Sequence, residues 1–359
     1  MADTKADSIG GSIAASDLSV AWGSSFMISA ILRIRFLLAP LAMLAMLAAC
    51  SAEPLNVPLT FQKNIQLPKD VGSPAIDLLT LDSGAGRLYV PHGSANTLEI
   101  IDVKSAKIIG SVPNLPGIKG IALSSDPNVV FTANGSDGSV SVVDVKLLKV
   151  LDNIKMGTSA DAIDYDPVYG LVLVSLDSKV LGVIDEKTRK ETGKMPLPGK
   201  PELRAIDKQG QVFQAINDKD EVLLIDPVTR SVVKTYKGCD IKSPTGVAFD
   251  PDQQRLFVAN SIPHTANEVS VIDVLVDRCL GTIDVDHSPD QVAFNSHLHH
   301  VYVANAGSNN VTVIDTVNLK PVGVVGTGKQ AATIAADSVT DTVWVAAARS
   351  GIVAKYHDP

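Results

Sequence analysis

Val269-Ser270-Val271-Ile272-Asp273 is one of six copies of a motif in this chain, a β-rich run that ends in Ile-Asp or Val-Asp. The other copies end at Asp102, Asp144, Asp185, Asp226 and Asp315. Successive copies end 41 to 47 residues apart. A period of this length predicts one supersecondary unit that is repeated around or along an axis.

Each repeat contains four short β-rich runs, which are clearest in the fifth. Residues 244–250, 255–260, 268–273 and 279–285 are separated by turns rich in Gly, Pro, Asn and Asp, without helical periodicity. Four-stranded units of about 40 residues predict propeller blades. The runs are apolar on both sides, as expected for a blade stacked between two others. The closing aspartate is interpreted as a turn residue that accepts nearby N–H groups, because six equivalent copies cannot each be an active site.

The number of inner strands predicts seven blades. These strands begin near Ala75, Ile118, Ala160, Leu203, Thr245, Asp290 and Ala332. The C-terminus supplies only three strands for the last blade, whereas residues 60–67 form a strand with no blade of their own. We therefore predict an all-β, seven-bladed β-propeller of four-stranded blades, in which the N-terminal strand completes the C-terminal blade and closes the ring.

Three repeats resemble the YVTN-type repeat, whose consensus runs Tyr-Val-Thr-Asn and then Val-Ser-Val-Ile-Asp. They combine residues 256–260 with 269–273, 301–305 with 311–315, and 131–134 with 140–144. The resemblance covers roughly residues 60–356; the third repeat lacks the asparagine, and Lys355-Tyr356 replaces Ile-Asp in the last. It implies a seven-bladed propeller but no single activity, because members range from surface and periplasmic binding proteins to relatives of lactonases and of dehydrogenase subunits.

The first fifty residues have the features of a secretion signal. Arg33 and Arg35 precede an apolar run over residues 36–49 that is too short to span a bilayer. Leu47-Ala48-Ala49-Cys50 resembles the lipobox of bacterial lipoproteins, which implies that Cys50 becomes the lipidated first residue of the mature protein. An ordinary signal peptide with a chance cysteine is the alternative.

The expected organisation follows from this resemblance. Residues 1–49 are an N-terminal extension and signal peptide, with Met27 as an alternative start, residues 50–59 are the lipidated cysteine and a linker, and residues 60–359 are the propeller. Ser51 after the cysteine implies the outer membrane in the enteric sorting pattern. The expected location is therefore the periplasm, with the protein anchored to the cell envelope.

Composition limits the partners. A net charge of −8 makes a nucleic-acid partner unexpected, because neutralisation of phosphates supplies most of that affinity. Aromatic residues make up only 4%, which argues against broad carbohydrate recognition. Beyond Cys50 only Cys239 and Cys279 remain, and they are a possible disulfide in an oxidising periplasm, although the sequence does not show that they meet. The expected state is a monomer.

Two loops are longer than their counterparts, and both belong to the face where propellers usually bind ligands. Asp226 to Pro244 spans 18 residues against 14 to 16 elsewhere, and Asn260 to Asp273 spans 13 against 9 or 10. With the following crossover they place Cys239 and five candidate ligand or metal residues on one sector of the rim: Asp240, His264, Asp286, His287 and Asp290. Imidazole and carboxylate groups bind divalent ions, whereas length variation in exposed loops is the alternative interpretation.

Two further groups of residues carry imidazole or charged side chains. His297-Leu298-His299-His300 has the spacing of a metal site but occupies a turn on the opposite face, so a solvated turn is favoured. Charged residues also lie near the starts of the inner strands, where they either line the mouth of the channel or remain solvated loop charges. They are Lys119, Asp161, Glu202, Arg204 and Asp290.

The favoured function is a lipid-anchored propeller of the cell envelope that binds a small ligand or an envelope protein without catalysis of its own. The alternative is a periplasmic enzyme, either a lactonase-like hydrolase or a dehydrogenase-associated subunit. No Gly-x-Ser-x-Gly, His-Glu-x-x-His or phosphate-loop motif is present. The sequence also shows no set of calcium ligands that would face the channel from several blades. Propeller dehydrogenases with a quinone cofactor repeat tryptophans between their blades, whereas the mature domain has only Trp344.

Overall fold

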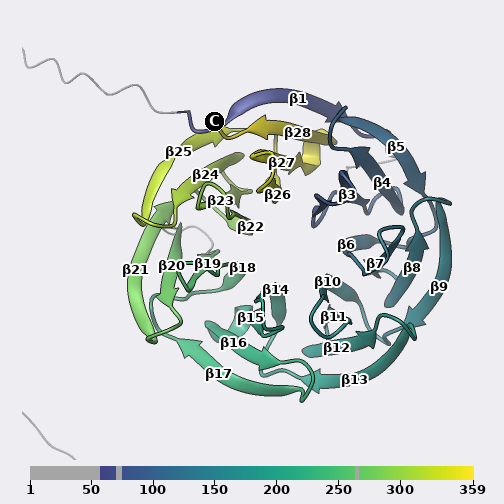
Figure 1. Cartoon of the computed structure of the whole chain (residues 1–359), viewed down its shortest axis with the longest axis horizontal. Helices are drawn as coiled ribbons and strands as arrows, with labels where there is room; N and C mark the ends of the chain where they lie inside the picture. The colour runs from purple at the N-terminus through teal and green to yellow at the C-terminus, as the bar shows by residue number, and fades with distance from the viewer. Residues whose placement is uncertain (1–56, 70–74, 263–266) are drawn as a thin grey trace, which may run out of the picture. The chain divides into compact units, whose positions relative to one another are not determined.

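The computed structural model describes residues 57–69, 75–262 and 267–359, and Cys50 and His264 lie outside this part of the chain. Within it, 28 strands form seven four-stranded antiparallel sheets. Figure 1 shows these sheets as seven blades arranged in a ring, with the first strand of each blade nearest the central channel. The predicted all-β, seven-bladed propeller is confirmed.

The strands follow the chain from the inner to the outer edge of each blade. The first four blades are β2 (Thr80–Asp82), β3 (Arg87–His92), β4 (Thr97–Asp102), β5 (Lys107–Val112); β6 (Ile118–Ala122), β7 (Val129–Asn134), β8 (Ser139–Asp144), β9 (Lys149–Lys155); β10 (Ala160–Asp166), β11 (Leu171–Leu176), β12 (Val180–Asp185), β13 (Lys190–Pro196); and β14 (Pro201–Ile206), β15 (Val212–Ile216), β16 (Glu221–Asp226), β17 (Ser231–Lys237). The last three blades are β18 (Pro244–Asp250), β19 (Arg255–Asn260), β20 (Asn267–Asp273), β21 (Arg278–Val285); β22 (Pro289–Asn295), β23 (His300–Asn305), β24 (Asn310–Asp315), β25 (Lys320–Gly326); and β26 (Ala331–Asp337), β27 (Thr342–Ala347), β28 (Ile352–His357), β1 (Thr60–Gln66).

Two short 3-10 turns, η1 (Asn217–Lys219) and η2 (Ala348–Ser350), lie between second and third strands. No helix among the described residues is long and apolar enough to cross a bilayer.

The six repeated aspartates end the third strands and shape the turns that follow. In each turn one carboxylate oxygen accepts a backbone N–H two or three residues later, for example that of Ser105 on Asp102 at 2.7 Å and that of Val228 on Asp226 at 2.9 Å. The other four aspartates make the same contact. These bonds satisfy N–H groups that a tight turn leaves unpaired, so the interpretation of the motif as turn chemistry is confirmed.

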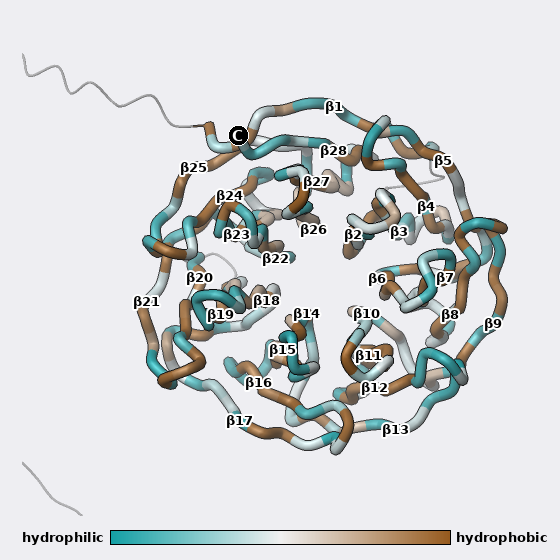
Figure 2. Tube along the Cα trace, viewed as in Figure 1, coloured by the Kyte–Doolittle hydropathy of each residue, from teal (hydrophilic) through white to brown (hydrophobic). Residues whose placement is uncertain are grey.

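The hydrophobic core is divided into seven clusters, each between two neighbouring blades. Figure 2 shows apolar residues along the strands all around the ring. Because the side chains on both faces of a blade pack against neighbours, the second and third strands are buried along nearly their whole length. The ring therefore depends on every blade having two partners.

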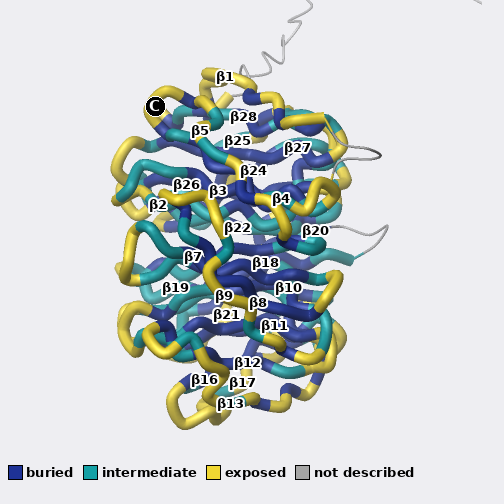
Figure 3. Tube along the Cα trace, turned by 90° about the vertical axis from the view of Figure 1, so that its right-hand side faces the viewer, coloured by how far each residue is buried: buried dark blue, intermediate teal, exposed yellow. Residues whose placement is uncertain are grey.

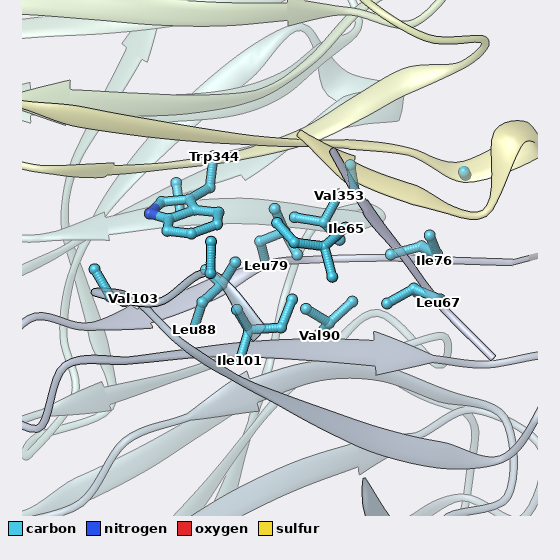
Figure 4. Packing of buried hydrophobic residues seen from close by; sticks show 14 residues of the cluster. Ile65, Leu67, Ile76, Leu79, Leu88, Val90, Ile101, Val103, Trp344 and Val353 are labelled. Carbon is cyan, nitrogen blue, oxygen red and sulfur yellow. The ribbon is translucent and has the colours of Figure 1, made fainter. Parts of the chain in front are cut away.

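Ring closure joins the two ends of the propeller. β1 pairs antiparallel with β28, from Thr60 opposite His357 to Gln66 opposite Ile352. Figure 4 shows Trp344 and Val353 of the seventh blade, with Ile65 of β1, facing Leu88 and Ile101 of the first blade. The first strand thus completes the last blade and contributes to the core that seals it to the first.

The ring has two different ends. We call the end with the crossovers between blades and the loops between second and third strands the upper end, and the opposite end with the other hairpin turns the lower end. Figure 3 shows the ring from the side, with the C-terminus at the lower end on the left. Because antiparallel strands alternate in direction, every inner strand begins at the upper end.

Candidate functional site

One position recurs at the upper end of the channel in every blade. It follows the first residue of the inner strand that pairs with the second strand, as Asp161 follows Ala160 and Asp290 follows Pro289. The register shifts directly after that first pair in the second to seventh blades, which marks a β-bulge. Such bulges re-aim side chains next to functional sites. The seven residues at this position are Asp77, Lys119, Asp161, Glu202, Thr245, Asp290 and Ala332.

The charged members of this set interact with one another across blades. We call Asp77, Lys119, Asp161, Glu202 and Asp290, together with Lys200, the mouth cluster. Lys119 Nζ lies 3.4 Å from Asp161 Oδ2, and Lys200 Nζ lies 2.5 Å from Glu202 Oε1. Among the described residues, no basic group lies within ion-pair distance of Asp77 or Asp290.

The pKa values in the mouth cluster are strongly perturbed. Burial in the channel, followed by the charges of Asp161 and Asp290, raises the pKa of Asp77 to about 7. Burial, followed by the charges of Glu202 and Asp161, raises the pKa of Asp290 to about 7. Burial also raises the pKa of Glu202 despite its contact with Lys200. Several half-buried carboxyl groups therefore raise one another's pKa at the channel mouth. Clusters of perturbed pKa values of this kind are typical of functional sites.

A hollow of about 450 Å³ adjoins the mouth cluster on the side of the first three blades. Asp77 and Lys119 line it together with the hydroxyl-bearing Ser94, Ser136 and Ser159. The loops that border it are glycine-rich, and a Cβ added at Gly135 would lie 2.8 Å from Lys119 Cε. The lysine thus occupies the space that a side chain would take, and the hollow offers both charge and hydrogen-bonding groups to a small ligand.

Below the mouth, Arg204 ties the third blade to the fourth. Its side chain is fully buried, and its guanidinium donates to Asp164 Oδ2 at 3.0 Å, to the Leu173 carbonyl at 2.7 Å and to Ser175 Oγ. Nε donates to Gln214 Oε1 at 2.9 Å. Burial lowers the pKa of Arg204. Arg204 lines a deeper channel section of about 280 Å³ with Asp164 and Gln291, but these contacts make it a structural group.

The sector of the rim around the fifth blade does not gather its candidate residues into one site. Asp290 belongs to the mouth cluster. Asp286 Oδ2 instead accepts Asn310 Nδ2 at 2.6 Å, and His287 Nδ1 lies 3.0 Å from Asn267 Nδ2. Asp240 is exposed, and its backbone carbonyl accepts Asn260 Nδ2 at 3.1 Å. No three of the described candidates bring ligand atoms close enough to share an ion.

Cys239 and Cys279 are joined in a disulfide, with Cα atoms 5.3 Å apart. The bridge connects the expanded crossover after the fourth blade to β21, the outer strand of the fifth. The longer crossover is thus tied covalently to the outer strand of the blade that it enters.

The histidines of the sixth-blade turn are partly solvated, with the side chain of His297 65% exposed, and each lies near a carboxylate of a neighbouring blade. His297 Nδ1 lies 2.9 Å from Asp341 Oδ2, and His300 Nδ1 lies 2.7 Å from Asp358 Oδ2. His299 Nδ1 approaches Asp250 Oδ2 at 3.8 Å. The three imidazoles reach carboxylates of the fifth and seventh blades because adjacent blades bring their lower turns side by side.

One trio in the described part of the chain has potential metal-ligand atoms close together: Asp250, Asp252 and His299, whose atoms all lie within 4.8 Å of one another. Asp250 already accepts hydrogen bonds from Thr316 Oγ1 at 2.7 Å and from the Asp252 amide at 2.9 Å. These bonds explain the buried carboxylate without a metal.

Sequence reasoning placed Lys119, Asp161, Glu202 and Asp290 near the mouth but missed Asp77. The inner strand β2 begins only at Thr80, and a single bridge between Ile76 and His92 sets the register of Asp77. Alignment of the seven inner strands on their first paired residue is the signal that finds it.

Comparisons with known proteins agree with this architecture. No family model matches the chain. No curated protein matches it. Among solved structures it is similar to hydrazine synthase of Kuenenia stuttgartiensis, with 17% identity and a TM-score of 0.71 over 80% of this chain and 97% of that one. It is also similar to the Cps50 (Swd1) β-propeller domain of Myceliophteria thermophila, with 11% identity and a TM-score of 0.67 over 82% of this chain and 99% of that one.

Both likenesses show the fold alone. Identities of this size leave activity and partners open. The resemblance to YVTN-type repeats therefore stays a prediction about family, whereas the seven-bladed fold stands on the structure.

Proposed function

We propose that this protein is a lipid-anchored binding module of the bacterial cell envelope, held at the periplasmic side of the outer membrane through Cys50, and without catalysis of its own. The mouth of the propeller channel binds a small ligand or a segment of an envelope protein. The observation that carries the proposal is the mouth cluster, in which four blades each supply a carboxyl group at an equivalent position.

A cationic ligand fits the mouth cluster best. Lys119 and Lys200 already pair with Asp161 and Glu202, so Asp77 and Asp290 carry the charge that remains to be neutralised. A ligand amine that contacts these two groups favours their ionised forms and replaces the water lost on burial. The serines of the adjoining hollow offer hydrogen bonds to the rest of the ligand.

Spermidine is a suitable probe of this proposal, because it is a small polyamine that can span neighbouring carboxylates. Isothermal titration at pH 6 and pH 8 is expected to show tighter binding at pH 8. Between pH 6 and pH 8, the ionised fraction of each group with a pKa of about 7 rises roughly tenfold. Asp77→Asn and Asp290→Asn are expected to lose this binding, whereas Asp284→Asn, on the outer strand β21, keeps it. Equal affinity in all variants would contradict a site at the mouth.

The anchor is tested separately. Full-length protein is expected in the membrane fraction and to incorporate labelled palmitate, and Cys50→Ser is expected to abolish both. A soluble, unlabelled wild-type protein would contradict the lipoprotein assignment.

A catalytic role is the second candidate, because two carboxyl groups at the channel mouth with pKa values of about 7 suit general acid–base chemistry. A lactonase-like hydrolase at the mouth, or a dehydrogenase-associated subunit, would use that property. Turnover of a panel of small lactones that is lost in both Asp77→Asn and Asp290→Asn would favour the hydrolase over the binding module.

A further inference from the structure

We infer that the lower end of the propeller rests on the surface of a lipid bilayer and points the channel mouth away from it. The inference rests on the lipid anchor proposed for Cys50. It adds a second, non-covalent contact with the membrane, made by the hairpin turns of the ring itself.

Exposed apolar side chains gather at the lower end. The described residues include sixteen large apolar side chains that are exposed. Nine lie in lower hairpin turns, six on outer strands and one, Val57, before β1, whereas none lies in an upper loop. The nine are Leu147, Leu148, Val168, Tyr169, Val228, Leu275, Val276, Val317 and Val339.

These side chains are distributed around the ring. Every blade from the second to the seventh presents at least one of them in a lower turn. The most exposed are Leu275 at 75% and Val339 at 81%, which belong to the fifth and seventh blades. A planar apolar surface can meet tips on several blades at once, whereas a small ligand or a single groove-bound peptide cannot.

Basic side chains accompany the apolar tips of the outer turns, which join third to fourth strands. Counted with the strand residue on either side, the six hairpin turns that join third to fourth strands contain ten basic and eight acidic residues, although the whole chain has a net charge of −8. The exposed lysines include Lys104, Lys146 and Lys320. Anionic lipid headgroups are therefore repelled less by this outer rim of the lower end than by the rest of the molecule.

The tether enters at the same end. Thr60, which opens β1, pairs with His357, the last residue of β28, at the lower end of the seventh blade. Cys50 precedes Thr60 by ten residues, which can span at most about 35 Å. An acylated Cys50 thus keeps the lower end near the bilayer. Because the tether gives this surface a high effective concentration at the membrane, weak apolar contacts are enough to hold it there.

The test uses full-length protein reconstituted in phosphatidylcholine–phosphatidylglycerol vesicles. A nitrobenzoxadiazole probe is attached at Leu275→Cys in the lower end or, as a matched control, at Ser178→Cys in the exposed upper loop between β11 and β12. Labelling is specific because Cys239 and Cys279 are joined in a disulfide and an acylated Cys50 does not react. The lower probe is expected to shift to the blue and to resist aqueous iodide, whereas the upper probe stays quenchable.

A second set of variants separates apolar contact from anchoring alone. With the probe at Val339→Cys, the double change Leu275→Ser/Val276→Ser is expected to increase iodide quenching. The matched change Val232→Ser/Val233→Ser on the outer strand β17 is expected to leave it unchanged.

The outcomes distinguish the two proposals. If the protein incorporates palmitate but iodide fully quenches the lower probe, the contact between the lower end and the bilayer is overturned and the lipid anchor stands. Absence of palmitate incorporation would overturn both. A blue shift of the lower probe in detergent without vesicles, growing with protein concentration, would show that a second copy covers this surface and would also overturn the inference.

Discussion

Replacement of Asp290 by asparagine is expected to stabilise the protein above pH 7. The carboxyl group is held in the channel mouth, where burial and the charges of Glu202 and Asp161 raise its pKa to about 7. Asparagine keeps the volume of the side chain and removes the charge. The substitution therefore isolates the free energy that the folded state loses by keeping this carboxylate ionised.

The sign and size follow from proton linkage. The group has a pKa of about 7 when folded and 3.8 in its ordinary state. The folded protein holds the proton more tightly between these values, so stability is highest below pH 3.8 and falls as the pH rises through 7. The full shift corresponds to about 4 kcal/mol. We expect a gain of about 1 to 3 kcal/mol, because the amide must itself be hydrogen-bonded and because Asp77 titrates with Asp290.

Urea unfolding at pH 8 and pH 4 checks this expectation. Asp290→Asn should unfold at a higher urea concentration than the wild type at pH 8, and its advantage should fall below about 1 kcal/mol at pH 4. Asp284→Asn, on the outer strand β21, controls for loss of a negative charge and should show no such pH dependence. Equal stability of Asp290→Asn and wild type at pH 8 would refute the desolvated mouth cluster.

Three further expectations concern the scaffold. Trp344→Ala should cost about 3 to 5 kcal/mol in urea unfolding, because Trp344 is fully buried in the core that closes the ring, and a cost below 1 kcal/mol would speak against that closure. Reduction of the disulfide between Cys239 and Cys279 should lower the free energy of unfolding by up to about 4 kcal/mol, because the bridge closes a loop over a separation of 40 residues. A thermal melt unchanged by reductant would rule this out. Arg204→Met should cost about 2 to 4 kcal/mol in urea unfolding, because the buried side chains of Ser175 and Gln214 lose a hydrogen-bond partner, and a cost below 1 kcal/mol would contradict this role.

Much of the fold was predictable because its signals are local. The Ile-Asp motif marks the end of a third strand, and the carboxylate that shapes the next turn acts within three residues of itself. Repetition of such a unit predicts the number of blades, since a blade cannot bury both of its faces alone. The positions of the turns can therefore be predicted from the sequence without knowledge of contacts between distant residues.

The candidate site was predictable only in part. Lys119, Asp161, Glu202 and Asp290 could be placed near the mouth, but their mutual effect on ionisation depends on distances across the channel. Asp77 was missed because a single bridge between Ile76 and His92 sets its register. The expanded loops of the fifth blade led instead to Asp240, Asp286 and His287, which the structure places in separate contacts on the rim.

The sequence by itself determined the repeating unit, the number of blades and the strand left over at the N-terminus, because each depends on patterns within about 40 residues. The tertiary structure alone decided which side chains share the channel mouth and which exposed apolar side chains lie together at the lower end. Blades pack face to face with their neighbours around an axis, so residues far apart in sequence acquire a common environment only when the ring closes. The low dielectric of that shared channel mouth then sets the charge of Asp77 and Asp290.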